Sequence, residues 1–89
     1  MSRTNNGMIL ALSQGVVQYS GKQPRGVEIV GDRKVPGTYA LRVHYTDDTE
    51  ATFLITGFHS GCTAEFVEQN LEEVEFTTWP PTSGELKFF

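Results

Sequence analysis

Two side chains that can do chemistry stand close together in the segment GFHSGCTAEF, residues 57–66. His59 and Cys62 are separated by two residues and lie just before an acidic stretch. A thiol at the start of a helix ionises more readily than an ordinary thiol, and a neighbouring imidazole can accept its proton. The same pair would supply two of the four ligands of a zinc site, with His44 as a third.

Neither kind of site is complete in the sequence. A nucleophile also needs an orienting third group and donors for an oxyanion, and no pattern near Cys62 supplies them. No ligand spacing around His59 and Cys62 demands a metal. We therefore interpret this segment as a junction between a loop and a helix, with Cys62 as a small buried side chain and Thr63 as the cap. We expect no enzymatic activity, no cofactor and no metal.

A row of glutamates without a nearby base follows the junction. On a helix over residues 63–75 the first three would face away from an apolar stripe formed by Ala64, Val67, Leu71 and Val74. Acids near the C-terminal end of a helix oppose its dipole, and no lysine or arginine lies four residues further on. Two interpretations stay open: a docking face for a basic partner, or a solvated face balanced by cations from the N-terminal half. The row consists of Glu65, Glu68, Glu72, Glu73 and Glu75.

Charge is divided unevenly along the 89 residues. Residues 1–42 contain six basic and two acidic side chains, whereas residues 43–89 contain one basic and nine acidic ones. An acidic domain of this kind repels nucleic acid, so direct nucleic-acid binding is not expected. The asymmetry favours a protein partner with a basic surface.

Two glycine-containing loops, 21–26 and 31–37, hold most of the positive charge, on Lys22, Arg25, Arg33 and Lys34. Backbone N–H groups and cations together cradle phosphates, so these loops are an alternative site for a small anion or a nucleotide. Their spacing matches neither a P-loop nor a dinucleotide fingerprint. Ordinary solubilising loops carry the same residues.

The segment TTWPP, residues 77–81, places Trp79 before two prolines. A tryptophan held in a rigid extended segment can serve as an apolar anchor for a partner. We therefore add Trp79 to the five glutamates as a predicted partner-binding residue. The alternative is that its ring folds back over the sheet and closes one end of a small core.

The elements that position these residues follow from the apolar pattern. Residues 8–12 are continuously apolar and fit either a strand or a short helix. Because residues 16–19 are rich in β-branched and aromatic side chains, we favour strands for both pieces, with a bend at Gly15. Another short strand is expected over residues 27–30.

Residues 39–45 and 50–55 alternate between apolar and polar side chains, as in a β-hairpin. Only a loop with an odd number of residues keeps the apolar side chains on one face, so we expect three or five loop residues. A three-residue loop over 47–49 would pair Val43 with Phe53 and Leu41 with Ile55. It would also place β-branched Thr49 where a left-handed backbone is preferred.

Together these elements predict an α+β fold. We expect a small twisted antiparallel sheet of about five strands, with one amphipathic helix near residues 63–75 packed on one face. The last strand would be a short edge strand over residues 85–89. Residues 1–7 are expected to be a flexible N-terminal segment and residues 8–89 a single globular domain.

Composition sets the broad class of the protein. No apolar run approaches the length of a membrane span, and a single cysteine cannot form an internal disulfide, which fits a reducing compartment. We therefore expect a soluble cytoplasmic protein. In size and charge the chain is similar to small accessory or inhibitor proteins such as those that phages encode, although no motif carries this likeness. The sequence thus favours a non-enzymatic protein-interaction module, and pairing into a homodimer would add stability to so small a domain.

Overall fold

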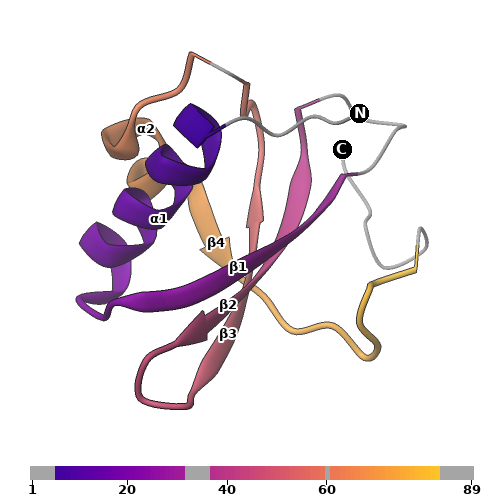
Figure 1. Cartoon of the computed structure of the whole chain (residues 1–89). Helices are drawn as coiled ribbons and strands as arrows, with labels where there is room; N and C mark the ends of the chain where they lie inside the picture. Colours follow the sequence, from indigo (N-terminus) through magenta and orange to yellow (C-terminus); the bar gives the residue numbers. More distant parts are fainter. Residues whose placement is uncertain (1–5, 32–36, 60, 83–89) are drawn as a thin grey trace.

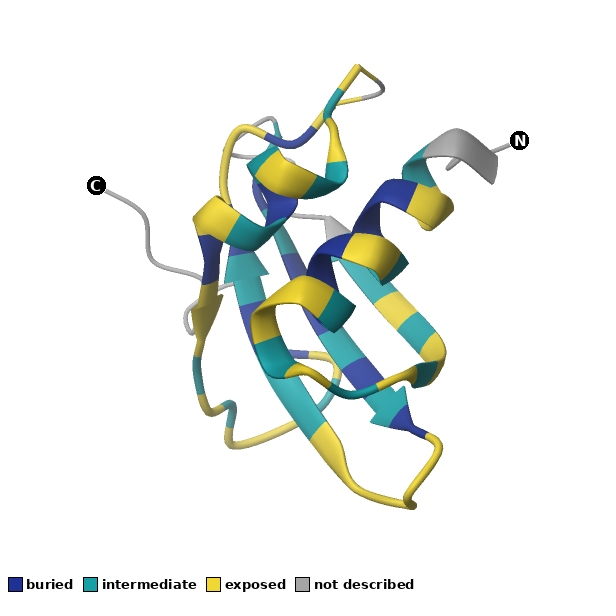
Figure 2. Ribbon diagram, turned by 90° about the vertical axis from the view of Figure 1, so that its left-hand side faces the viewer, coloured by how far each residue is buried: buried dark blue, intermediate teal, exposed yellow. Residues whose placement is uncertain are grey.

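A computed structural model describes residues 6–31, 37–59 and 61–82 of the chain. The strands form one antiparallel sheet in the order β1-β2-β3-β4, and both helices lie on the same face of it (Figures 1 and 2). The predicted α+β class is confirmed, with four strands rather than about five in the described part of the chain. Residues 85–89, the expected last strand, lie outside that part. The elements are α1 (Asn6–Ser20), β1 (Pro24–Gly31), β2 (Tyr39–Tyr45), β3 (Glu50–Ile55), α2 (Ala64–Asn70) and β4 (Leu71–Glu73).

The N-terminal apolar segment is a helix, so the strands predicted at 8–12 and 16–19 are wrong. The residues that face the core recur at helical spacing. Asn6 and Gly7, from the segment expected to be flexible, already belong to α1, and residues 1–5 lie outside the described chain. The core-facing stripe consists of Met8, Ala11, Leu12, Gly15 and Val16.

The helix predicted over residues 63–75 is correct only in its first half. Thr63 caps α2 as expected, because its hydroxyl accepts a hydrogen bond from the Phe66 N–H at 3.2 Å. The helix ends at Asn70, where Leu71 takes an extended backbone and begins β4, which pairs with β3. A longer helix would have placed three glutamates against the negative end of its dipole. The strand avoids this arrangement and buries Leu71.

The β2–β3 hairpin confirms the predicted odd-numbered loop. Leu41 pairs with Phe53 and Val43 with Ala51, which leaves the three residues 46–48 between Tyr45 and Thr49. The loop therefore lies one residue earlier than the one considered at 47–49. Its left-handed residue is Asp48, with φ 68°, and aspartate tolerates this conformation better than a β-branched residue does.

The core lies between the two helices and the inner face of the sheet (Figure 2). Strand β1 contains the strand expected over residues 27–30 and begins three residues earlier, at Pro24. Among the described residues, no helix is both long and apolar enough to span a membrane. The side chains that are fully or almost fully buried include Leu12, Val16, Leu41, Val43, Phe53, Ile55 and Val67.

Candidate functional site

The loop before α2 holds its histidine and cysteine through backbone groups. The Cys62 thiol accepts a hydrogen bond from the backbone N–H of His59 at 3.3 Å and lies 3.6 Å from the carbonyl oxygen of Gly57. Nδ1 of His59 accepts a hydrogen bond from the backbone N–H of Gly61 at 3.0 Å. No hydrogen bond joins the imidazole to the thiol, and within residues 6–31, 37–59 and 61–82 no cluster of metal-ligating side chains forms. The geometry is that of a loop leading into a capped helix.

The acids of the β2–β3 turn are paired with cations from the segment between α1 and β1. Nζ of Lys22 lies 3.1 Å from Asp47, and Arg25 lies 3.3 Å from Asp48. Thr49 donates hydrogen bonds to Asp47 from both its hydroxyl and its backbone N–H. These bonds, helped by Lys22, lower the pKa of Asp47 to about 2.

This pairing bears on the predicted anion site. In the alternative interpretation Lys22 and Arg25 would bind a phosphate; in the structure both form ion pairs with acids at the tip of the hairpin. Lys22 also donates a 2.6 Å hydrogen bond to Thr49. The other two predicted ligands, Arg33 and Lys34, lie outside the described residues.

Five side chains on the outer face of the sheet form a closed ring of contacts. Nε2 of His44 lies 2.7 Å from Glu28, and its Nδ1 lies 3.6 Å from Glu50. Glu50 is 3.5 Å from Nε of Arg42, whose guanidinium lies 5.0 Å from the centre of the Trp79 ring. The indole N–H of Trp79 closes the ring by donating to Glu28 at 3.4 Å. The hydrogen bond from His44 is the main reason why the pKa of Glu28 is lowered.

The five glutamates between residues 65 and 75, here called the acidic ridge, have different surroundings. Within the part of the chain that the structure describes, none of them forms an ion pair. The one hydrogen bond recorded for their carboxylates comes from Gln69 to Glu65, at 3.5 Å. Helix α2 has no basic residue in its last turn. In β4, Glu72 lies opposite Leu54 and Glu73 opposite Phe53, so no cation lies directly across the sheet from them. Because successive side chains of a strand point to opposite faces, Glu72 and Glu73 do not continue the single row that was expected on a longer helix.

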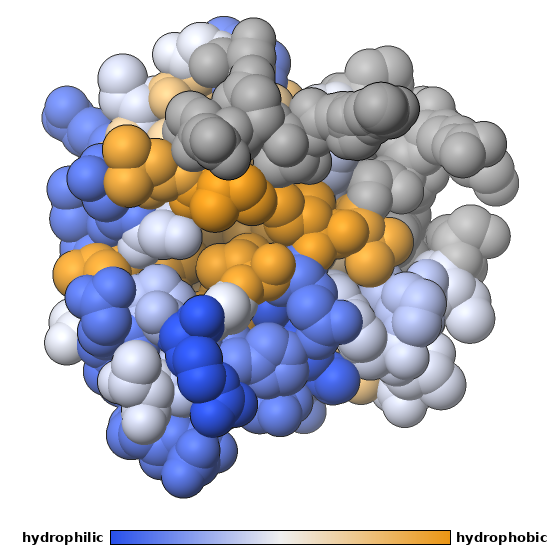
Figure 3. Space-filling model, in the orientation of Figure 1, coloured by the Kyte–Doolittle hydropathy of each residue, from blue (hydrophilic) through white to orange (hydrophobic). Residues whose placement is uncertain are grey.

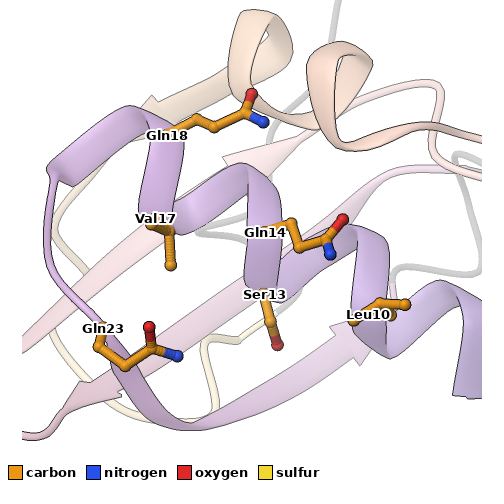
Figure 4. A pocket seen from close by; sticks show the side chains of 6 residues that line it. All are labelled: Leu10, Ser13, Gln14, Val17, Gln18 and Gln23. Carbon is orange, nitrogen blue, oxygen red and sulfur yellow. The ribbon is translucent and has the colours of Figure 1, made fainter.

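A second surface, next to α1, was not predicted from the sequence. Apolar side chains gather in the angle between α1 and β1 (Figure 3). A groove of about 620 Å³ runs along the helix there, and Ser13, Val17 and Gln23 point into it (Figure 4). The sequence does contain a pattern that indicates this surface. The core-facing residues that begin at Met8 recur at helical spacing, and this spacing also identifies the residues of α1 that remain outside the core.

Comparison with protein-family models, with characterised proteins and with solved structures finds no match for this chain. The candidate site therefore rests on the arrangement of its own residues. Exposed carboxylates without internal partners attract basic groups from solution, and they are the most distinctive charged surface among the described residues.

Proposed function

We propose that this chain is a non-enzymatic protein-interaction module, an inhibitor or accessory protein in character, that binds the basic surface of a partner through the acidic ridge. One contrast carries the proposal. The four described acids of β1, β3 and the β2–β3 turn all contact Lys22, Arg25, Arg42 or His44, whereas no such pairing is found within the described residues for the five acids of the ridge. Among the described residues, the unpaired negative charge is thus concentrated on α2, β4 and Glu75.

The physics of the ridge favours association with a cation-rich surface. Neighbouring carboxylates repel one another when no cation separates them, and a basic partner would relieve this repulsion. Complementary charge also steers the approach of the two molecules and raises the association rate. Because the ridge is exposed, salt should weaken binding strongly; the screening length is about 8 Å at physiological ionic strength.

Trp79 has a defined place in this proposal. Its ring is half-buried, packs on Arg42 and lies 6.0 Å from the ring of Phe76. A partner would therefore meet a ring that is already held in position, which loses little conformational freedom on binding.

The test compares two variants that gain the same charge. The ridge variant Glu68→Gln/Glu72→Gln/Glu73→Gln neutralises three unpaired acids. The control Glu28→Gln/Asp48→Asn/Glu50→Gln neutralises three acids that already have partners: Asp48 and Glu50 form ion pairs, and Glu28 contacts His44 and Trp79. Partners captured from cell extract by the wild type at low salt are identified, and their affinities for each variant are measured across a salt series.

The ridge variant should bind a partner more weakly by about 0.6–3 kcal/mol, or roughly 3- to 150-fold, because each of the three charge contacts contributes about 0.2–1 kcal/mol. It should also show a shallower dependence on salt. The control should keep nearly the affinity of the wild type. Equal binding by the wild type and the ridge variant for every captured partner would refute the proposal.

A further inference from the structure

Helix α1 differs from the rest of the molecular surface because none of its 15 residues is charged. A fifth of the whole chain consists of aspartate, glutamate, lysine and arginine. A surface helix normally carries such residues on its outer side. The large hydrophobic side chains that are exposed in the described chain all lie on α1: Ile9, Leu10 and Tyr19, with exposed fractions of 39%, 57% and 41%.

The exposed apolar surface continues from α1 to β1. Leu10 and Val17 line the groove along the helix, together with the uncharged polar residues of α1 (Figure 4). Val27 and Ile29, on the inner face of β1, pack against the core but are only partly buried. Figure 3 shows apolar side chains gathered over this region. We call the surface formed by α1 and β1 the α1–β1 face.

We propose that the α1–β1 face binds a second copy of this chain about a two-fold axis. In such a contact the same patch meets itself, so a charged residue near the axis would lie close to a like charge. A neutral patch of leucine, valine and glutamine avoids that repulsion. A basic partner would find no carboxylate in the groove, because every residue that lines it is uncharged.

One edge of β1 gives the second copy a place to pair. Strand β1 stands at the end of the strand order, so one of its edges has no neighbour among the described strands. It is eight residues long, whereas β4 at the other edge has three residues, two of them glutamates. Long edge strands tend to pair with another strand, and short charged ones resist pairing. Strand β1 contains Arg25 and Glu28, and its register shifts between Pro24 and Gly26, so we expect pairing in the part from Val27 onward.

Antiparallel pairing of β1 with its own copy also satisfies the pattern of side chains. In one kind of register, even-numbered residues of one strand lie opposite even-numbered residues of the other, and odd-numbered opposite odd-numbered. Such a register keeps both α1 helices on the same side of the joined sheet. Centring that register on Glu28 would oppose like charges, whereas centring it on Ile29 joins two apolar side chains. The second register is therefore the one that we expect.

The charge of the chain does not oppose this arrangement. Strand β4, with Glu72 and Glu73 of the acidic ridge, is at the opposite edge of the sheet from β1. Helix α2, with Glu65 and Glu68, packs against α1 instead. In a joined sheet of eight strands the two copies of β4 would be seven strand spacings apart, roughly 30 Å in a twisted sheet. This separation is several times the screening length of about 8 Å. The glutamates of β4 therefore do not oppose contact at this face, although each chain has a net charge of −4.

Sedimentation of the full chain over a concentration series from micromolar to millimolar tests the proposal. The average mass should rise from 9.9 kDa towards twice that value. Leu10→Lys would place two like charges in the contact, and we expect it to weaken self-association at least tenfold. Because Leu10 is largely exposed, its replacement should leave the thermal midpoint nearly unchanged. Gln69→Lys adds the same charge on α2 and should associate as the wild type does.

A mixture gives a result that a misfolded variant would not. Leu10→Lys and Leu10→Glu should each remain monomeric alone and associate when mixed, because the added charges then attract. The β1 amides that do not pair with β2 should exchange more slowly with solvent at high concentration. A wild type that stays at 9.9 kDa at millimolar concentration would overturn the proposal, as would a mixture that fails to associate or a Leu10→Lys chain that associates normally. The ridge variant should still associate, which separates this test from that of the proposed function.

Discussion

Replacing Gly15 with alanine would test the close contact between the two helices. A Cβ atom at this position would lie 2.4 Å from Cγ1 of Val67, 2.5 Å from its Cβ and 3.1 Å from the carbonyl oxygen of Ala64. Normal carbon–carbon contacts are about 3.5–4.0 Å. Rotating the valine side chain cannot relieve the clash, since its own Cβ is one of the atoms that are too close. The helices would have to move apart.

The expected cost follows from two opposing effects. Alanine is favoured over glycine in a helix by about 0.8–1.0 kcal/mol, which would stabilise α1 if the site were open. Overpacking of a buried site costs about 1–3 kcal/mol. The upper end applies here because separating the helices also loosens the fully buried Leu12 and Val16. The net loss should be about 2 kcal/mol, or roughly 8–16 °C in thermal midpoint for a domain of this size.

Urea and thermal unfolding, followed by circular dichroism, would measure this loss. Gly26→Ala is the matched control, because a Cβ there meets no atom within 4 Å and its change should stay within about 0.5 kcal/mol. Combining Gly15→Ala with Val67→Ala removes the nearest atom of residue 67 but not its Cβ at 2.5 Å. The second substitution should therefore restore stability only in part, with a coupling free energy between the two sites of about 0.5–1.5 kcal/mol. A Gly15→Ala protein as stable as the wild type, or strict additivity in the double variant, would refute the described contact.

Four further predictions concern the hairpin and the thiol. Thr49→Val removes the hydroxyl that donates to Asp47, so the pKa of Asp47 should rise from about 2 towards 3.8 in an NMR titration; an unchanged value would contradict the described turn. Because the pKa of Asp47 is lower in the folded state, its ionised form stabilises the fold fully above about pH 4, and this effect should disappear as pH falls towards 2. Asp47→Asn should therefore flatten the plot of unfolding free energy against pH between these two values. Asp48→Gly should unfold no earlier in urea than the wild type, and Asp48→Val should lose about 1–2 kcal/mol, since only the valine is strained at a φ of 68°. Cys62 should react with a mild alkylating reagent no faster than a free model thiol; faster reaction would revive an interpretation in which it is a nucleophile.

The hairpin was predictable because its pattern is local. Alternation in residues 39–45 and 50–55 fixes which side chains share a face, and parity then restricts the loop to an odd number of residues. The placement of the loop was one residue out because Asp48 and Thr49 compete for the left-handed position. The lower strain of aspartate there decides that competition.

The nature of α1 depends on contacts that lie far apart in the sequence. Gly15 and the valines beside it are weak helix formers, so propensity alone favoured strands with a bend. The structure uses the glycine differently: it lets Val67 of α2 approach the backbone of α1. Glycine usually indicates a break in a helix or strand, but here it allows two helices to pack closely.

The charge pattern was informative about the candidate site only in part. The sequence located the excess of acids, but it could not show which acids have partners. Lys22 reaches Asp47 because the end of α1 lies beside the β2–β3 turn, a neighbourhood set by the fold rather than by spacing along the chain. The pairing of Arg25 with Asp48 has the same origin. What distinguishes the acidic ridge is therefore visible only once the elements are placed.

The two proposed surfaces have a joint consequence, because their strands, β1 and β4, are at opposite edges of one sheet. A dimer joined through the α1–β1 face would present two acidic ridges, and a partner with repeated basic sites could bind both at once. Linked binding of this kind can raise apparent affinity by about 10²–10⁴ without any new contact. Leu10→Lys should therefore weaken binding to a surface densely coated with a basic partner, although the ridge is unchanged. Its affinity for a single partner molecule in solution should equal that of the wild type, and an equal loss in both assays would show that the α1–β1 face contacts the partner itself.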